Sequence, residues 1–451
     1  MAKIVVIGAG SVAFSLSLMQ DFALTKGLSG STVTFMDISE ERLEMVYNLA
    51  SRYVKELGME LNLEKTTSRE KAIEGADFVI DTVKVDGYDF MEAEREIAEK
   101  YGYYRGIDDK VSDYYGGFFA YKQLNFFLEL AKDVERISPN AWFMQVSNPV
   151  FEGTNLIARE TGLKVAGFCH GAQGYKDIVR VLRLDPDEVE AQVVGLNHCT
   201  WLTKFLYKGK DAYPLIDEWI ERESERYWKS DEYLHNPWNY HITPAAVEMY
   251  KLYGVFPVGD AVRSVSPWWF NTDLKTKEKW FSSGGPDSEV GWTMYLFRLR
   301  EKLRMMERIA EDQSIVITDQ LPPKPSGEVI VPFIDAVIND RKTELILNVP
   351  NNGAIEGLPD DVVVEVPVIV SKDGIERKRI GKLPSRLMFH IMIPRWQRME
   401  IVLQAFIERD RRSLLLMLME DHRTRSREQV ELLIDEMLSQ PWNAGARQHY
   451  L

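Results

Sequence analysis

The chain of 451 residues has few cysteines, no long apolar run and no excess of positive charge. Two cysteines are too few for a disulfide framework and are typical of a reducing cytoplasm. The apolar stretch Ile4–Ile7 is too short for a signal peptide, and no other run approaches the length of a membrane span. With 69 acidic and 55 basic residues, the net charge of −14 disfavours nucleic acids and anionic membranes as partners. We therefore expect a soluble, cytoplasmic protein.

Internal repeats and low-complexity segments are also absent from the sequence. The composition, with 45% hydrophobic and 27% charged residues, is that of a globular protein, and 451 residues exceed what one core normally holds. We expect an α/β fold with an N-terminal Rossmann-type doubly wound domain over residues 1–195. A C-terminal α+β domain over residues 196–451 should complete the active site and the oligomer interface.

The first residues have the pattern of a dinucleotide-binding fold. Lys3–Ile7 predicts a buried parallel strand, and the GxGxxA sequence Gly8-Ala-Gly-Ser-Val-Ala13 predicts a tight turn that opens a helix. Gly8 allows the turn, and Gly10 allows a phosphate to approach the backbone at the N-terminus of the helix. The turn therefore supplies four predicted cofactor contacts, which are Gly8, Gly10, Ser11 and Val12.

A second predicted strand, Thr32–Met36, ends in Asp37. An acidic residue at this position can bind both hydroxyls of an adenosine ribose and repels a 2′-phosphate, which indicates NAD rather than NADP. The alternative is a turn aspartate that caps the next helix, predicted over Glu40–Leu57.

Two further predicted strands continue the alternation of strand and helix. The strand Phe78–Thr82 ends in a predicted cofactor contact, Thr82. The strand Trp142–Val146 is followed by Ser147-Asn-Pro149, at the edge where a doubly wound domain meets the nicotinamide half of its cofactor. We therefore expect Asn148 to contact the cofactor as well.

Both cysteines stand beside a histidine, in Cys169-His170 and in His198-Cys199. Thiolate and imidazole are well suited to borderline-soft divalent metals. Each pair follows a short strand-like run, Leu163–Ala166 or Val193–Val194, which predicts both pairs at one edge of a sheet. The alternative is that these are ordinary buried cysteines and core histidines.

The second half of the chain has a different character. Residues 214–310 are mainly helical in pattern and rich in aromatic residues, which can form a core or stack on a sugar. Further on, strands are predicted at Val329–Ile334, Leu345–Val349 and Val362–Val370. A helical tail follows from about Pro394. We expect its arginines to lie on a solvated or subunit-facing surface; they are Arg395, Arg398, Arg409, Arg411 and Arg412.

Together these residues offer a dinucleotide site, a Cys/His metal pair and an aromatic lobe. A hydride carrier beside a divalent cation suits the oxidation of a secondary alcohol, because the metal can bind the alcohol and a neighbouring oxygen. The residues alone therefore predict an NAD- and metal-dependent enzyme that acts on a polyhydroxylated substrate. An NAD-dependent dehydrogenase of a hydroxy acid or polyol stays an alternative, and so does a non-catalytic sensor.

The order of the motifs resembles that of one known family. The motifs are Gly8-Ala-Gly-Ser11, Tyr101-Gly-Tyr-Tyr-Arg-Gly-Ile-Asp108, Val111-Ser-Asp-Tyr-Tyr115, Asn148-Pro149, Cys169-His-Gly171, Gly195-Leu-Asn-His198 and Pro257-Val-Gly-Asp-Ala-Val-Arg263. Over nearly its whole length the chain resembles glycoside hydrolase family four, the NAD- and manganese-dependent glycosidases. Within that family it is most similar to the alpha-glucosidase and alpha-glucuronidase branch.

The resemblance implies an unusual route of hydrolysis. NAD oxidises C3 of the sugar, a base removes the C2 proton, the leaving group at C1 is eliminated, water adds and the ketone is reduced again. The ordinary mechanism with two carboxylates does not apply to this family. An alpha-glucosidase is the first expectation and an alpha-glucuronidase the second, in each case as a homodimer or homotetramer.

The resemblance also implies roles for individual residues. Cys169 and His198 are expected to bind the metal, with two sugar oxygens completing its shell. His170 is then the candidate acid for the leaving group and Asp260 the candidate base at C2, although the two could exchange roles or act through water. The other expected contacts to the sugar are Asp113, Asn148 and Arg263.

Some residues depart from the family pattern. Ala172-Gln173 follows the first Cys/His pair, and Cys199 follows His198. Both departures are expected beside the sugar, so they leave glucoside, glucuronide and galactoside specificity open.

Overall fold

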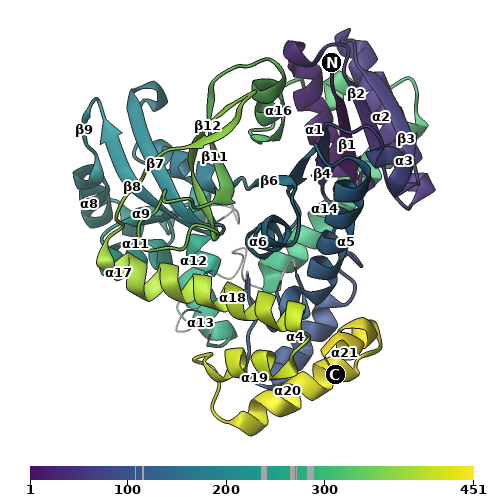
Figure 1. Ribbon diagram of the computed structural model, residues 1–451. Helices are drawn as coiled ribbons and strands as arrows, with labels where there is room; N and C mark the ends of the chain where they lie inside the picture. The colour runs from purple at the N-terminus through teal and green to yellow at the C-terminus, as the bar shows by residue number, and fades with distance from the viewer. Residues whose placement is uncertain are drawn as a thin grey trace.

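The computed structural model describes residues 1–106, 108–113, 116–234, 241–264, 270, 272–281 and 289–450. Within these ranges thirteen strands form one mixed sheet in the order β10-β8-β7-β12-β11-β6-β5-β4-β1-β2-β3, with β13 beside β12 and β9 beside β8. Helices pack around this sheet, and the C-terminal helices lie together at one end of the molecule (Figure 1). The α/β class is therefore as predicted.

Parallel strands make up the half of the sheet that contains the N-terminus. They are β1 (Lys3–Ile7), β2 (Thr32–Met36), β3 (Asn62–Thr66), β4 (Phe78–Asp81), β5 (Trp142–Gln145) and β6 (Lys164–Gly167). The residues of Ile4–Ile7 are all buried, as is usual for a parallel strand inside a doubly wound sheet. The helices of this half are α1 (Val12–Leu24), α2 (Glu40–Leu57), α3 (Arg69–Ile73), α4 (Met91–Lys100), α5 (Tyr121–Ile137) and α6 (Val150–Glu160). The Rossmann-type arrangement expected from the sequence is confirmed.

Local signals explain why the bounds of α2 agree with the prediction. Ser39 caps the start of the helix, where its side chain accepts a hydrogen bond from the backbone N–H of Arg42. Gly58 follows the last residue in the left-handed conformation, at φ 65°, and so ends the helix.

The other half of the sheet is antiparallel. It consists of β7 (Val189–Leu196), β8 (Cys199–Tyr207), β9 (Lys210–Asp211), β10 (Phe256–Val258), β11 (Thr343–Pro350), β12 (Val363–Ser371) and β13 (Gly374–Arg377). Strand β11 returns to pair with β6, so strands from both sides of residue 195 share one sheet. The domain boundary proposed there stays a prediction.

A row of paired residues crosses four neighbouring strands of this sheet. Gly167 on β6 pairs with Asn348 on β11, Asn348 pairs with Glu365 on β12, and Glu365 pairs with Gly195 on β7. The two Cys/His pairs follow shortly after the glycines at the two ends of this row. Segments far apart in the sequence therefore meet over the same part of the sheet.

The strand predicted at Val329–Ile334 is wrong, because this segment begins the helix α16 (Ile330–Ile338). Its run of β-branched residues favours a strand, but tertiary packing decides otherwise. The Phe333 ring makes edge contacts with the rings of Trp142 and Phe168, at centroid distances of 5.1 and 5.4 Å, so the helix packs against the sheet.

The remaining helices come after β6 in the chain. They are α7 (Tyr175–Val181), α8 (Tyr213–Arg222), α9 (Ser224–Tyr227), α10 (Asp231–Leu234), α11 (Pro244–Tyr253), α12 (Ala261–Ser264), α13 (Leu274–Phe281), α14 (Glu289–Glu311), α15 (Ile317–Gln320), α17 (Ser385–Leu387), α18 (Ile393–Glu408), α19 (Arg411–Met419), α20 (Arg427–Ser439) and α21 (Ala444–Tyr450). Among the helices of the described ranges, none is long and apolar enough to cross a membrane. Part of the aromatic run, at 235–240 and 265–269, lies outside those ranges.

Asp81, the last residue of β4, gives a testable prediction. Burial raises the pKa of its carboxyl from 3.8 to about 7. The folded protein therefore holds this proton more tightly than the unfolded chain, and stability from the neutral carboxyl is lost as the pH rises from about 4 towards 7. We expect Asp81→Asn to raise the free energy of unfolding at pH 8 by on the order of 2 kcal/mol.

Urea unfolding at pH 5 and pH 8 measures this effect, and the gain should be clearly smaller at pH 5. Asp77→Asn, at an exposed aspartate just before the same strand, is the control for removing a carboxylate from this part of the protein. An equal gain for Asp81→Asn at both pH values would contradict the account.

Candidate active site

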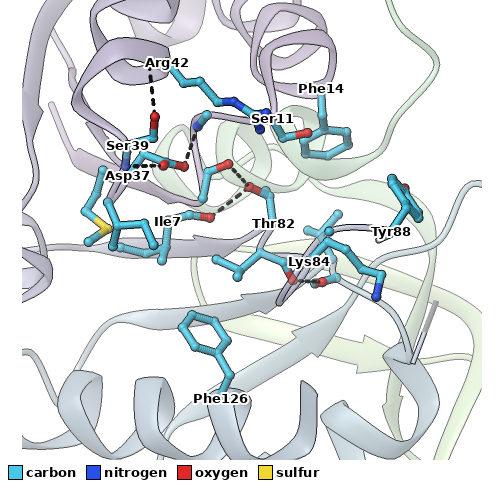
Figure 2. Close-up of a pocket in the computed structure, with 18 of the residues that line it drawn as sticks. Ile7, Ser11, Phe14, Asp37, Ser39, Arg42, Thr82, Lys84, Tyr88 and Phe126 are labelled. Atoms are coloured by element: carbon cyan, nitrogen blue, oxygen red, sulfur yellow. Dashed lines mark hydrogen bonds between the residues drawn. The ribbon is translucent and has the colours of Figure 1, made fainter. Parts of the chain in front are cut away.

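A cavity of about 1650 Å³ lies at the carboxyl ends of β1, β2, β4 and β5. Most of the residues predicted to bind the cofactor line it, as Figure 2 shows in part. They are Gly8, Gly10, Ser11, Asp37, Thr82 and Asn148. The seventh predicted cofactor residue, Val12, begins α1, and its side chain lies outside what the structure describes.

Steric constraints explain why the turn after β1 contains glycine at positions 8 and 10. Gly8 has a φ of 86°, and a Cβ there would meet Val83 Cγ2 at 2.7 Å. A Cβ on Gly10 would meet Asp37 Oδ2 at 2.6 Å. The turn therefore needs glycine at both positions, as the GxGxxA pattern predicted.

Asp37 connects the turn to the next helix. Its Oδ2 accepts a hydrogen bond from Gly10 N at 2.7 Å, and its Oδ1 accepts one from Ser39 N at 2.9 Å (Figure 2). The N-terminal cap of α2 is Ser39, so Asp37 does not cap this helix as the alternative interpretation proposed. Asp37 lines the cavity, and its contact with a ribose stays a prediction.

Residues that follow β4 and β5 also line the cavity. Thr82 donates a hydrogen bond to Ile7 O at 2.8 Å, which ties the ends of two neighbouring strands together. Gln123 Nε2 donates to Asn148 O at 3.0 Å and so holds the loop after β5. The cavity is lined by the glycine turn and by polar residues at the strand ends, which fits a dinucleotide.

Cys169 and His198 come together as the sequence predicted. The Cys169 thiol and the His198 imidazole are hydrogen-bonded to each other. His198 lies in the tight turn between β7 and β8 with a φ of 57°, and Cys169 follows the end of β6. Cys199 is fully buried at the start of β8, and burial raises the pKa of its thiol to about 12, which suits a core residue.

Asp260 joins this pair through a close approach of two backbones. Gly259 has a φ of 62°, and a Cβ there would meet Gly171 O at 2.5 Å. The contact places Asp260 Oδ2 at 3.7 Å from His198 Nε2. Arg263 holds the carboxylate from the other side, with Nη1 at 2.8 Å from Asp260 Oδ1.

The thiol and the imidazole fit a divalent metal as an open site. Among the residues that the structure describes, no group of three or more His, Cys, Asp or Glu side chains is arranged to hold a metal ion. Two protein donors would leave coordination positions for substrate oxygens, as an active metal requires. The donor types alone do not select manganese, because thiolate and imidazole bind softer metals at least as well.

Asp108 is a site residue that sequence reasoning missed. Its Oδ2 lies 3.1 Å from His198 Nδ1, and it accepts a hydrogen bond from Ser264 Oγ at 2.6 Å. Burial alone would raise the pKa of Asp108, but the charges of His198 and Arg395 outweigh it and hold that pKa well below its usual value. The same contact raises the pKa of His198 well above its usual value, although burial alone would lower it. The place of Asp108 at the end of the motif that begins at Tyr101 was the available signal in the sequence.

The expectation that Arg395 lies on the surface is wrong. Its side chain is 2% exposed, and Nη2 and Nη1 lie 3.3 Å from Asp108 Oδ2 and 2.9 Å from Glu152 Oε1. The physical reason is that two buried carboxylates provide partners for its charge, which an arginine-rich helix pattern does not reveal.

Asp113 is buried next to Asp108. Its Oδ1 accepts a hydrogen bond from Asp108 N at 2.8 Å. Burial, and then the nearby Asp108 charge, raise the pKa of Asp113 to about 7. The raised pKa favours the protonated form of this carboxyl, which is able to donate a hydrogen bond.

His170 is the predicted site residue that lies apart from the others. Its side chain is 57% exposed, and its Nδ1 lies 3.9 Å from Glu328 Oε1, before α16. The structure thus brings together Cys169, His198 and Asp260, while the His170 ring is directed to a different segment.

Glu365 is another residue that the sequence did not single out. It is buried on β12, where Oε2 accepts a hydrogen bond from Asn197 Nδ2 at 3.1 Å. Burial raises the pKa of Glu365 to about 7. Through Asn197 it supports the turn that carries His198.

Comparison with known proteins decides the family. The family model described as "Family 4 glycosyl hydrolase" matches residues 3–184, and that for the C-terminal domain of the same family matches residues 193–424. The chain belongs to the family 4 glycosyl hydrolases. The family expected from the order of the motifs is confirmed.

Individual family 4 relatives differ in their substrates. An alpha-galactosidase from Bacillus subtilis (strain 168) is 27% identical over 86% of this chain and 85% of its own length. An alpha-galacturonidase from Thermoanaerobacterium saccharolyticum (strain DSM 8691 / JW/SL-YS485) is 27% identical over 90% of this chain and 88% of its own. A solved 6-phospho-alpha-glucosidase from gut microorganisms, in complex with NAD and Mn²⁺, has a TM-score of 0.77 at 17% identity and covers 99% of this chain and 98% of its own. This last likeness supports the fold.

Proposed function

We propose that the protein is an NAD- and divalent-metal-dependent alpha-glycosidase. The observation that carries this proposal is that Cys169, His198 and Asp260 lie together. They meet beyond the end of β6, and β6 is the neighbour of β5 in the sheet. The end of β5 leads into the cavity at Asn148. A redox cofactor, a metal and a base would therefore lie within reach of one sugar. The family 4 structure solved with NAD and Mn²⁺ supports the choice of cofactors.

NAD held at Gly8, Gly10 and Asp37 would supply hydride transfer at C3 of the sugar, and a divalent metal held by Cys169 and His198 would supply Lewis-acid polarisation of the neighbouring hydroxyls. Oxidation at C3 would make the C2 proton acidic. Asp260 is the proposed base for that proton. Its carboxylate has Arg263 on one side and His198 on the other, so its orientation is restrained. Asp113, when protonated, can donate a hydrogen bond to a sugar hydroxyl, and Asn148 can do so at the nicotinamide end.

His170 is the proposed proton donor to the leaving group. Because its ring is 57% exposed and directed to Glu328, we propose that it acts through a water molecule. A leaving group that extends towards solvent would reach this side of the site. The cytoplasmic location and the dimer or tetramer stay predictions.

Among alpha-glycosides we propose a glucoside as the first substrate, on the resemblance of the motifs. One observation favours an alpha-glucuronide as the second candidate. Lys84 lines the cavity two positions after Thr82, and no described residue forms an ion pair with it. Burial lowers the pKa of its ammonium, and the Asp113 carboxyl is the first of the nearby charges that oppose this effect. A cation so close to a proposed sugar contact could bind a carboxylate at C6.

The proposed reaction predicts exchange with solvent at the sugar. Turnover in D₂O should place deuterium at C2 of the released sugar, and mass spectrometry or proton NMR detects it. Asp260→Asn should slow both this exchange and the overall reaction by at least about 100-fold, because one general base is lost. NAD binding, measured by fluorescence titration, should change little.

A product without deuterium at C2 would contradict the redox route and support direct displacement at C1. Net formation of NADH from the substrate would instead identify a dehydrogenase, since the glycosidase cycle returns its hydride.

The role of Lys84 predicts the substrate class. A panel of nitrophenyl alpha-glucoside, galactoside, glucuronide and galacturonide, with NAD, Mn²⁺ and reductant, measures kcat/KM for each. If the substrate is a uronide, Lys84→Met should lower kcat/KM for that sugar by about 10- to 100-fold, as expected for a lost charge-assisted contact. If the substrate is a neutral glycoside, the variant should affect it much less. Lys122→Met, which removes a neighbouring lysine paired with Asp86, is the matched control.

A further inference from the structure

Asp108 determines which nitrogen of His198 faces the proposed metal position. The two side chains are each 3% exposed, and Asp108 Oδ2 lies 3.1 Å from His198 Nδ1. The other ring nitrogen, Nε2, faces Asp260. A carboxylate on one nitrogen of a metal-binding histidine fixes its tautomer and its orientation, and leaves the other nitrogen for the metal.

Asp108 is itself held by a buried charged cluster. Arg395 on α18 places Nη2 at 3.3 Å from Asp108 Oδ2, and its Nη1 lies 2.9 Å from Glu152 Oε1 on α6. Lys110 Nζ lies 2.6 Å from the same Glu152 oxygen. Ser264, the last residue of α12, donates a hydrogen bond to Asp108 Oδ2 at 2.6 Å. The cluster therefore connects the C-terminal helices with the turn that carries His198.

We propose that Arg395 is a positioning residue for metal binding that acts through Asp108 on His198. This inference rests on the metal site of the proposed function. A guanidinium keeps its charge under all ordinary conditions, so it holds a charged carboxylate in place inside the protein. Two of its nitrogens face two carboxylates at once, which restrains the Asp108 side chain from rotating away from the imidazole.

Stability alone is a weak reason for this cluster. Buried ion pairs cost much desolvation, and well-packed apolar residues often stabilise a fold as well or better. A cluster that reaches the histidine of the proposed metal pair can instead set the affinity for the metal. The competing explanation is that Arg395 only fastens α18 to α6.

The chain contains a matched control for that competing explanation. Arg159 on α6 forms two hydrogen bonds of 2.7 Å with Glu400 on α18. This pair joins the same two helices as Arg395 and Glu152. Among the described residues, the partners of Arg159 and Glu400 are each other, Asp361 and Trp396, and not Asp108 or His198.

The experiment compares Arg395→Met, Arg395→Lys and Arg159→Met in the full-length protein. Free Mn²⁺ is followed by electron paramagnetic resonance during titration without substrate, which gives a dissociation constant independent of activity. We expect Arg395→Met to bind Mn²⁺ about 10- to 100-fold more weakly, as found for residues that orient metal ligands. Arg395→Lys should recover part of the affinity, and Arg159→Met should stay within about twofold of the parent. NAD affinity should stay unchanged in all three.

Equal Mn²⁺ affinity in Arg395→Met and Arg159→Met would overturn the proposal. If Arg395→Met does not fold, Arg395→Lys and Ser264→Ala decide, since the second removes only one hydrogen bond to Asp108. A loss of affinity in both supports the proposal, and unchanged affinity in both overturns it. A parent protein that binds no divalent metal at all would instead refute the metal site of the proposed function.

Discussion

The contact between the Asp108 carboxylate and the His198 imidazole is the interaction on which the candidate site depends. His198 lies in a two-residue turn between antiparallel strands, where its ring could take several orientations. The buried carboxylate restrains it to one orientation, with Nε2 towards Asp260 and the thiol of Cys169 hydrogen-bonded to the ring. Other parts of the fold serve this arrangement, because the central row of the sheet brings the end of β6 and the turn after β7 to the same place.

Features with local causes could be predicted from the sequence. The glycine turn follows from steric needs at Gly8 and Gly10, and the bounds of α2 follow from a serine cap and a left-handed glycine. The strands of the Rossmann half are short, uninterrupted apolar runs between helices, which is a clear pattern. The meeting of Cys169 with His198 was also predicted, because both follow strand ends of what proved to be one sheet.

Features with distant causes could not be predicted. Asp108 is separated from His198 by 90 positions in the sequence, so no spacing rule connects them. Arg395 stands in a helix rich in arginine, and its burial depends on carboxylates from two other segments. The segment before Ile338 has β-branched residues typical of a strand, but its packing against Trp142 and Phe168 makes it a helix. In each case the partner that decides the structure is far away in the chain.

X-ray absorption spectroscopy of the metal-loaded protein tests the central claim most directly, because it identifies the atoms bound to the metal. The account predicts one sulfur and one imidazole nitrogen among the ligands. The sulfur signal should be lost in Cys169→Ser and kept in Cys199→Ser, since the Cys199 thiol is buried in the core. A shell without sulfur in the parent, or a sulfur signal that disappears only in Cys199→Ser, would contradict the proposed ligand pair.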